Sequence, residues 1–276
     1  MRFYSRRFLG LLACGCLLSA AGWAQAPARP APASTLPTPP SDEQSYQKEF
    51  VYGINFNTQG ALIGGVSLRS ARVLDERLLR FWSLEAVMLK NQKEVQEPTN
   101  LGGSYIRHKT NYAFALRPSF GLQRILFRKA ADAGVQVNGL VSAGPSLGLL
   151  MPYYIVYDRT VAANPSQQIN TSTDEIVNEQ YDPNKHNVKN AILDRAPLFT
   201  GLGGTKLVPG AHFRGALSFE YGRYRDAVAG VEVGFLVEAY TRRMVILKPP
   251  TLSDVDDLNH QFFPSVYLTL YFGQRS

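Results

Sequence analysis

Polar and apolar residues alternate one by one in several separate segments of this sequence. In residues 212–221 one set of alternate positions is apolar or small and the other is mostly polar: Phe213, Gly215, Leu217, Phe219 and Tyr221 against His212, Arg214, Ala216, Ser218 and Glu220. Successive side chains of a β-strand point to opposite faces of the sheet, so a period of two gathers the apolar side chains on one face. The segment therefore predicts a β-strand with one apolar and one polar face.

The same alternation recurs along the chain. Seven further segments show it, namely residues 52–57, 62–69, 81–88, 112–120, 134–144, 231–240 and 265–272. Segments of about 10 residues with alternating hydrophobicity, separated by turns, are typical of transmembrane β-barrels. We therefore predict an all-β fold, a transmembrane antiparallel up-and-down β-barrel of about eight strands. The apolar faces would meet lipid, including Tyr112 and Phe114 in one of these segments.

The lengths of the connections support this topology independently. In such barrels the periplasmic turns are short and the outer loops are long. Counted from a periplasmic N-terminus, the inner connections are short and all but one of the outer connections are long: residues 72–77, 127–133 and 223–226 against 91–109, 151–206 and 243–261, with 58–60 as the one tight outer turn. A soluble sandwich or a lipocalin also alternates, but it has no reason to sort its connections in this way.

Residues 1–26 have the pattern of an export signal. Three arginines in residues 1–7 precede an apolar run, and residues 24–26 (Ala-Gln-Ala) match the small-x-small cleavage site. Two variants stay open, because residues 5–9 resemble a twin-arginine signal and residues 11–14 resemble a lipoprotein box that would leave Cys14 lipidated. The only cysteines, Cys14 and Cys16, lie in this segment, so a chain cut at residue 26 would have no thiol.

The rest of the chain divides into a linker and one folded domain. Residues 27–49 begin with a Pro- and Ala-rich stretch that favours an extended periplasmic linker, and residues 50–276 would form the barrel. The net charge of +7 falls to +4 when the arginines of residues 1–7 leave with the signal, which argues against nucleic-acid binding. After Trp23 no apolar stretch approaches the roughly 20 residues of a transmembrane helix. A chain that spans the membrane must then do so as a closed barrel.

The polar faces of the expected strands would gather inside the barrel. The predicted interior network comprises Asn55, Arg69, Glu85, Arg117, Gln136, Asn138, His212, Arg214, Glu220, Glu232 and Glu238. This arrangement could be a proton or ion path, a catalytic cluster, or a plug of ion pairs and hydrogen bonds. The interior of an eight-stranded barrel is just wide enough for side chains to fill, and buried charges are kept only when they are paired. The near balance of signs therefore favours the plug.

The sequence offers no convincing catalytic group. His212 and Ser218 share a face, but six residues at roughly 3.4 Å each separate them by about 20 Å along a strand. The other histidines lie in or beside expected outer loops, where we expect solvated side chains: His108, His186 and His260. We therefore predict that the protein is not an enzyme and binds no cofactor.

One acidic segment raises the question of a metal site. Asp254, Asp256 and Asp257 lie close together in the last outer loop. Calcium requires six to eight oxygens and a turn-forming glycine, and this segment lacks that frame. We expect a solvated acidic loop and no metal.

Several segments resemble a known group of proteins. Residues 52–58 (YGINFNT), 125–129 (ILFRK) and 144–148 (GPSLG) are similar to the small outer-membrane β-barrel proteins of Bacteroidetes-type bacteria. The resemblance covers most of the chain from Phe50 onward and implies a barrel in the bacterial outer membrane. Members of this group mostly lack an assigned activity, so the resemblance implies little about chemistry.

Together these features predict a non-enzymatic outer-membrane barrel, porin-like in fold, that acts as a membrane scaffold or as an accessory subunit of an envelope assembly or export complex. The alternative is a lipid A-modifying hydrolase of the outer membrane. Besides lipid, the expected contact with protein partners is the outer loop 151–206, although it could also be a variable surface loop. This loop opens with Tyr153, Tyr154 and Tyr157, aromatics suited to the membrane interface.

Overall fold

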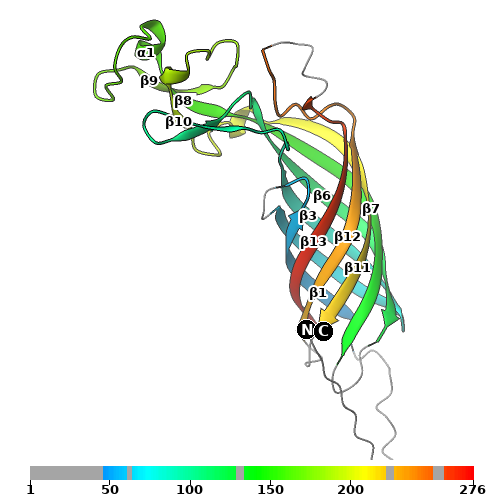
Figure 1. Cartoon of the computed structure of the whole chain (residues 1–276). Helices are drawn as coiled ribbons and strands as arrows, with labels where there is room; N and C mark the ends of the chain where they lie inside the picture. The colour runs from blue at the N-terminus through cyan, green and yellow to red at the C-terminus, as the bar shows by residue number, and fades with distance from the viewer. Residues whose placement is uncertain (1–45, 61–63, 129–133, 222–226, 251–257) are drawn as a thin grey trace, which may run out of the picture. The chain divides into compact units, whose positions relative to one another are not determined.

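The computed structural model describes residues 46–60, 64–128, 134–221, 227–250 and 258–276, all within one compact unit, Glu43–Ser276. Eight long strands of this unit close into a barrel (Figure 1). They are β1 (Lys48–Asn57), β2 (Gly65–Asp75), β3 (Leu78–Leu89), β6 (Asn111–Phe127), β7 (Val135–Pro152), β11 (Lys206–Tyr221), β12 (Ala227–Tyr240) and β13 (Phe262–Arg275). The expected signal, residues 1–26, lies outside the described residues, and β1 begins two residues before the expected barrel boundary at residue 50.

Every barrel strand pairs antiparallel with its neighbours along the chain, and β1 closes the barrel against β13. The closing register sets Tyr52 opposite Phe272 and Asn55 opposite Thr269. Closure leaves no unpaired sheet edge, which is the condition for a sheet to stand in hydrocarbon. The predicted eight-stranded up-and-down barrel is confirmed.

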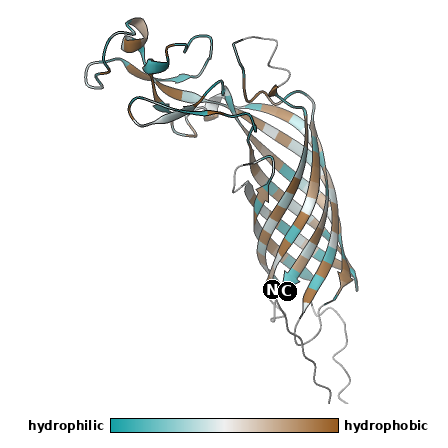
Figure 2. Cartoon of the chain, in the orientation of Figure 1, coloured by the Kyte–Doolittle hydropathy of each residue, from teal (hydrophilic) through white to brown (hydrophobic). Residues whose placement is uncertain are grey.

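The alternation seen in the sequence separates the outside of the barrel from its inside. Large apolar side chains on the outer face are exposed, as with Trp82 at 66% and Val66 at 59%. On the same two strands, polar side chains such as Arg69 and Glu85 are buried, so hydrophobic and hydrophilic positions alternate along the ribbon (Figure 2). An apolar outer belt around a polar interior is the arrangement of transmembrane barrels.

The connections are short at one end of the barrel and long at the other. The β2–β3 turn is two residues, Glu76 and Arg77, and both ends of the described chain meet at this same short-turn end, where the backbone of Gln47 donates to Ser276. The connections from β3 to β6, from β7 to β11 and from β12 to β13 are all at the opposite, long-loop end. The predicted sorting of loops is confirmed.

The connection expected as a long outer loop, residues 151–206, is folded. It forms a three-stranded sheet of order β10-β8-β9 from β8 (Tyr154–Asp158), β9 (Ile176–Gln180) and β10 (Ile192–Arg195). A hairpin of β4 (Gln96–Pro98) and β5 (Ser104–Ile106) lies against it, with the Thr99 hydroxyl donating to the Leu193 carbonyl at 2.6 Å. We call residues 96–106 and 153–205 together the extension.

The helices of the extension are short turns. They are α1 (Arg159–Ala163), η1 (Lys189–Ala191) and η2 (Leu202–Gly204). The first begins where β8 ends, because the buried Asp158 carboxylate accepts a hydrogen bond from the Val161 N–H and satisfies a free helix N-terminus. No helix in the described part of the chain is long and apolar enough to cross a membrane.

A cluster of tyrosines joins the extension to the barrel wall. Tyr153 is 0% exposed, and its ring lies 5.2 Å from that of Tyr112 and 6.2 Å from that of Tyr181. The expected roles of three tyrosines are therefore wrong: Tyr112 does not face lipid, and Tyr153 and Tyr157 are buried core residues rather than membrane-interface residues. The reason is that the start of β6 and the apolar residues of the extension pack against each other.

Candidate functional site

All eleven residues of the predicted interior network are buried in the barrel. Three arginines carry its charge pairing. Arg117 binds Glu238 through two hydrogen bonds of 2.9 and 2.7 Å, Arg69 donates to Glu232 at 2.7 Å, and Arg214 pairs with Glu85.

These pairs are linked to each other and to aromatic rings. Arg117 also lies 3.6 Å from Glu85, and the Tyr267 hydroxyl donates to Glu232 at 2.7 Å. The guanidinium of Arg214 lies 4.6 Å from the Tyr267 ring centre. Charge-assisted hydrogen bonds and ring contacts together compensate for the loss of water around these ions. The geometry is that of a fixed ionic plug.

The remaining polar residues make separate contacts. Gln136 donates to Asn138 at 2.9 Å, and Asn55 donates to the Thr269 hydroxyl at 3.2 Å. Glu220 does not join the three central arginines, because its partner is Arg275 near the short-turn end.

This second ionic group was missed in the sequence. Arg275 donates to Glu49 at 2.9 Å and to Glu220 at 2.8 Å, and its guanidinium lies 4.2 Å from the Tyr46 ring centre. Burial raises the pKa of Tyr46 to about 12. Glu49 lies on the same alternating positions of β1 as Asn55, and Arg275 on the same alternating positions of β13 as Tyr271. Extending the alternation before residue 52 and beyond residue 272 would have found them.

His212 lies between two serines. Its Nε2 is 2.7 Å from the Ser119 hydroxyl and its Nδ1 is 3.0 Å from the Ser146 hydroxyl. The strand register explains the contact, because His212 lies opposite Gly144. A Cβ at Gly144 would clash with the Pro118 carbonyl oxygen and lie 3.0 Å from the Ser119 Cα, so the glycine lets the backbone of Ser119 come close. The Ser218 considered in the sequence instead contacts the Tyr271 hydroxyl at 2.6 Å. A serine beside a histidine is the first requirement of a nucleophile, but all three side chains are buried.

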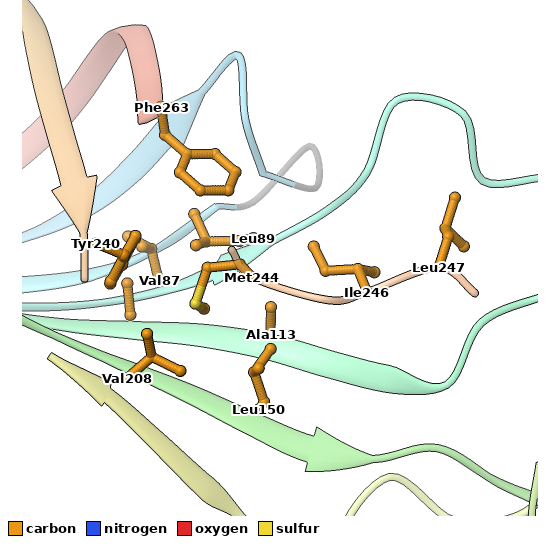
Figure 3. Close-up of a cluster of buried hydrophobic side chains, with 11 residues drawn as sticks. Val87, Leu89, Ala113, Leu150, Val208, Tyr240, Met244, Ile246, Leu247 and Phe263 are labelled. Carbon is orange, nitrogen blue, oxygen red and sulfur yellow. The ribbon is translucent and has the colours of Figure 1, made fainter. Parts of the chain in front are cut away.

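Apolar side chains fill the long-loop end of the barrel interior (Figure 3). Met244, Ile246 and Leu247, from the β12–β13 connection, pack with inward residues of the strands: Val87, Leu89, Ala113, Ala115, Leu150, Val208, Tyr240 and Phe263. The Asn259 amide fixes this segment by accepting from the Ile246 N–H at 2.7 Å and donating to the Leu247 carbonyl at 2.6 Å. A void of about 20 Å³ lies beside the ionic network, lined in part by Arg69, Arg214 and Glu232. Its volume is enough for roughly one water.

The expected loop histidines differ in their surroundings. His260 is exposed, as expected, whereas His108 is half-buried. His186 is buried between the rings of Tyr157 and Tyr181, at 4.5 and 5.8 Å, so its assignment as a solvated residue is wrong. It became a core residue because the extension folds around it.

The acidic segment with Asp254, Asp256 and Asp257 lies outside the described residues. Among the residues that are described, no group of three or more His, Cys, Asp or Glu side chains could hold a metal ion.

A buried lysine lies in the connection between β3 and β6. Lys109 precedes β6 and donates to Glu94 at 2.8 Å, and its ammonium lies 4.8 Å from the Tyr112 ring centre. Burial lowers the pKa of Lys109, and the neighbouring Glu94 carboxylate opposes that shift. The Thr110 N–H donates to the Ile246 carbonyl at 2.9 Å, and the Thr110 carbonyl accepts from the Tyr153 N–H at 2.8 Å. Thr110 therefore contacts both the β12–β13 connection and the extension.

A groove of about 930 Å³ opens between the extension and the β12–β13 connection. We call it the basic groove, because its lining includes five cationic side chains: Lys185, Lys206, Arg242, Arg243 and Lys248. Its acidic lining residues are Glu179 and Asp182.

These observations define a class of protein. A closed antiparallel barrel of eight strands, apolar outside and with ion pairs buried inside, is a membrane-spanning barrel of the bacterial outer membrane. Comparison of the sequence with protein-family models and with curated proteins gives no match.

Among solved structures, the chain is similar to Ail, the attachment invasion locus protein of Yersinia pestis. The identity is 8%, the match covers 84% of this chain and 99% of that chain, and the TM-score is 0.36. A second structure of Ail, in complex with the heparin analogue sucrose octasulfate, gives the same identity and coverage with a TM-score of 0.34.

Proposed function

We propose that the protein is a non-enzymatic membrane anchor that holds the extension at the cell surface, as a scaffold or accessory subunit of an envelope assembly or export complex. The observation that carries this proposal is the combination of a plugged interior with a folded extension. Ion pairs and an apolar cluster occupy the described interior, which supports a barrel without a solute path, and the outer end presents an ordered surface. The resemblance to Bacteroidetes-type barrels without assigned activity is compatible with this role.

The surface proposed for a protein partner lies on the segment that leads into β11. Phe199 is 66% exposed and Leu202 is 61% exposed, beside the exposed Leu198. Aromatic and aliphatic side chains that stand out from a folded surface are typical anchors of protein interfaces.

The test is purification from the native membrane in mild detergent, followed by identification of what co-purifies. We expect a defined envelope protein that is lost from the Phe199→Ser/Leu202→Ser variant. The matched control is Val95→Ser/Leu101→Ser, which removes exposed apolar side chains from the β4–β5 region and should keep the partner. If the wild-type chain co-purifies with lipid alone, the accessory-subunit proposal is wrong.

The second candidate function is a lipid A-modifying hydrolase, and the observation in its favour is the 2.7 Å contact between Ser119 and His212. We propose that this pair is structural, because both side chains are buried and apolar residues fill the barrel interior at the long-loop end. Mass spectra of lipid A from cells with and without the protein separate the two functions. The hydrolase requires a changed acyl pattern that Ser119→Ala abolishes, whereas the scaffold leaves lipid A unchanged.

A further inference from the structure

Among the described residues, the basic groove is lined by more cationic than acidic side chains. Lys185 and Lys206 are exposed and Lys248 is half-buried, and among the described residues none of the three pairs with a carboxylate. Arg242 also lines the groove, and one of its guanidinium N–H groups donates to the Leu207 carbonyl at 2.8 Å. An arginine has five N–H donors, so most of those on Arg242 stay available to a ligand.

The two carboxylates of the groove do not balance these cations. Glu179 accepts from Arg159 at 2.6 Å and lies 3.4 Å from His186. Burial raises the pKa of Glu179, but its contacts with Arg159 and His186 outweigh this effect and hold it below the usual value. The Asp182 carboxylate accepts from the Asn184 N–H at 3.0 Å. The excess positive charge therefore faces the open groove.

We propose that the basic groove binds a saccharide that carries several phosphate groups. Cations on both walls, with Lys185 on the extension and Lys206 and Lys248 on the barrel side, fit an extended ligand with more than one negative group. Asn178 and Gln180 in the same lining offer amide donors and acceptors for sugar hydroxyls. The groove is at the long-loop end, which faces the cell exterior in barrels of this class, so surface saccharides and free polyanions can both reach it.

The proposal goes beyond the anchoring role and does not depend on it. A protein partner bound through Phe199 and Leu202 would leave the groove lining unchanged, so failure of the pull-down and failure of ligand binding are separate results.

The test measures binding of the detergent-folded chain to two probes, soluble polyphosphate and vesicles that contain purified lipopolysaccharide. The groove variant is Lys185→Gln/Lys206→Gln/Lys248→Gln, and we expect it to weaken binding about tenfold or more and to reduce the salt dependence. The matched control, Lys48→Gln/Arg72→Gln/Arg77→Gln, removes equal charge from exposed positions at the short-turn end and should bind as the wild type does. Retention of the unboiled gel mobility shows that each variant is folded.

The two probes distinguish the sources of the ligand. Binding to the vesicles alone assigns the groove to a saccharide of the cell's own surface, and binding to both probes supports recognition of phosphate in either form. The proposal is overturned if neither probe binds, or if the control variant loses affinity as much as the groove variant. If the triple variant does not fold, Lys206→Gln/Lys248→Gln with Arg72→Gln/Arg77→Gln as its control gives the same comparison.

Discussion

At the scale of single residues, the interior of the barrel shows how charge can be kept out of water. Arg214 and Glu85 are both buried, and each has a second neighbour, because Tyr267 lies under the guanidinium and Arg117 lies near the carboxylate. A buried ion pair of this kind need not exceed an apolar pair in stability, but loss of one partner leaves the other charge uncompensated. The network is therefore sensitive to single substitutions.

Replacement of Arg214 with Met tests this directly. It leaves Glu85 with only the longer contact to Arg117, and we expect a loss of about 3–5 kcal/mol in resistance to urea or heat. The measurement is the unfolding midpoint followed by the mobility of unboiled protein on a gel. Adding Glu85→Gln should restore part of the loss, because it removes the orphaned charge.

The control for this substitution is Phe219→Met on the exposed outer face, where an apolar side chain still meets lipid. It should change the midpoint far less than Arg214→Met. An unchanged midpoint for Arg214→Met, together with the loss of a measurable ion flux, would mean that the interior is a pathway and not a plug.

At the scale of elements, the barrel strands could be predicted and the extension could not. Strands such as β11 and β13 alternate with a period of two over most of their length, because one face meets lipid and the other meets the interior, so the sequence alone predicts them. The strands β8 and β9 are five residues each and pair across the long segment that separates them. Their order depends on tertiary packing around Tyr153, which leaves no period to detect.

The tyrosine cluster should control the stability of the extension without affecting the barrel. Tyr153→Ala removes a fully buried ring and the hydroxyl that accepts from the Ile106 N–H at 3.1 Å. The extension should lose about 3–5 kcal/mol of stability. Proteolysis within residues 164–190 should then be faster, while the resistance of the barrel to heat stays near that of the wild type. Phe199→Ala, at an exposed ring, is the control and should not accelerate cleavage. Equal cleavage rates for the two variants would show that the cluster does not hold the extension.

The candidate site was only partly visible in the sequence for a similar reason. The alternation of the strands predicted Arg117 and Glu238 as interior residues, but the pairing between them depends on how the sheet closes into a barrel. The Ser119 and Ser146 contacts of His212 come from different strands, and only the register across β6, β7 and β11 brings them together. The basic groove has no local signal, because Lys185, Lys206 and Lys248 are far apart in the sequence and only the fold brings them together.

At the scale of the whole molecule, the sorting of loops fixes the orientation in the membrane. A cysteine at the exposed Gln180 of the extension should react with an impermeant maleimide on intact cells, whereas one at the exposed Glu76 of the β2–β3 turn should react only after lysis. The chain cut at residue 26 would have no other thiol, so the signal has one source. Labelling of Glu76→Cys but not Gln180→Cys on intact cells would show that the barrel is inverted.

The closed barrel, its buried ionic network and the apolar cluster at the long-loop end together predict a membrane-spanning protein that conducts no ions. Transmembrane barrels with an open lumen conduct ions, whereas an eight-stranded barrel is just wide enough for its own side chains. A barrel can therefore fold in the membrane without forming an open channel, and both properties can be measured on one preparation.

The most direct measurement is the current across a planar lipid bilayer that contains the refolded protein, after a gel has shown different mobility for boiled and unboiled samples. We expect the mobility shift of a folded barrel and no sustained conductance, since Met244, Ile246 and Leu247 pack in the outer end of the interior and Arg214 and Arg117 are paired below them. Stable conductance steps from the folded wild-type protein, lost only when the protein is unfolded, would contradict a plugged barrel.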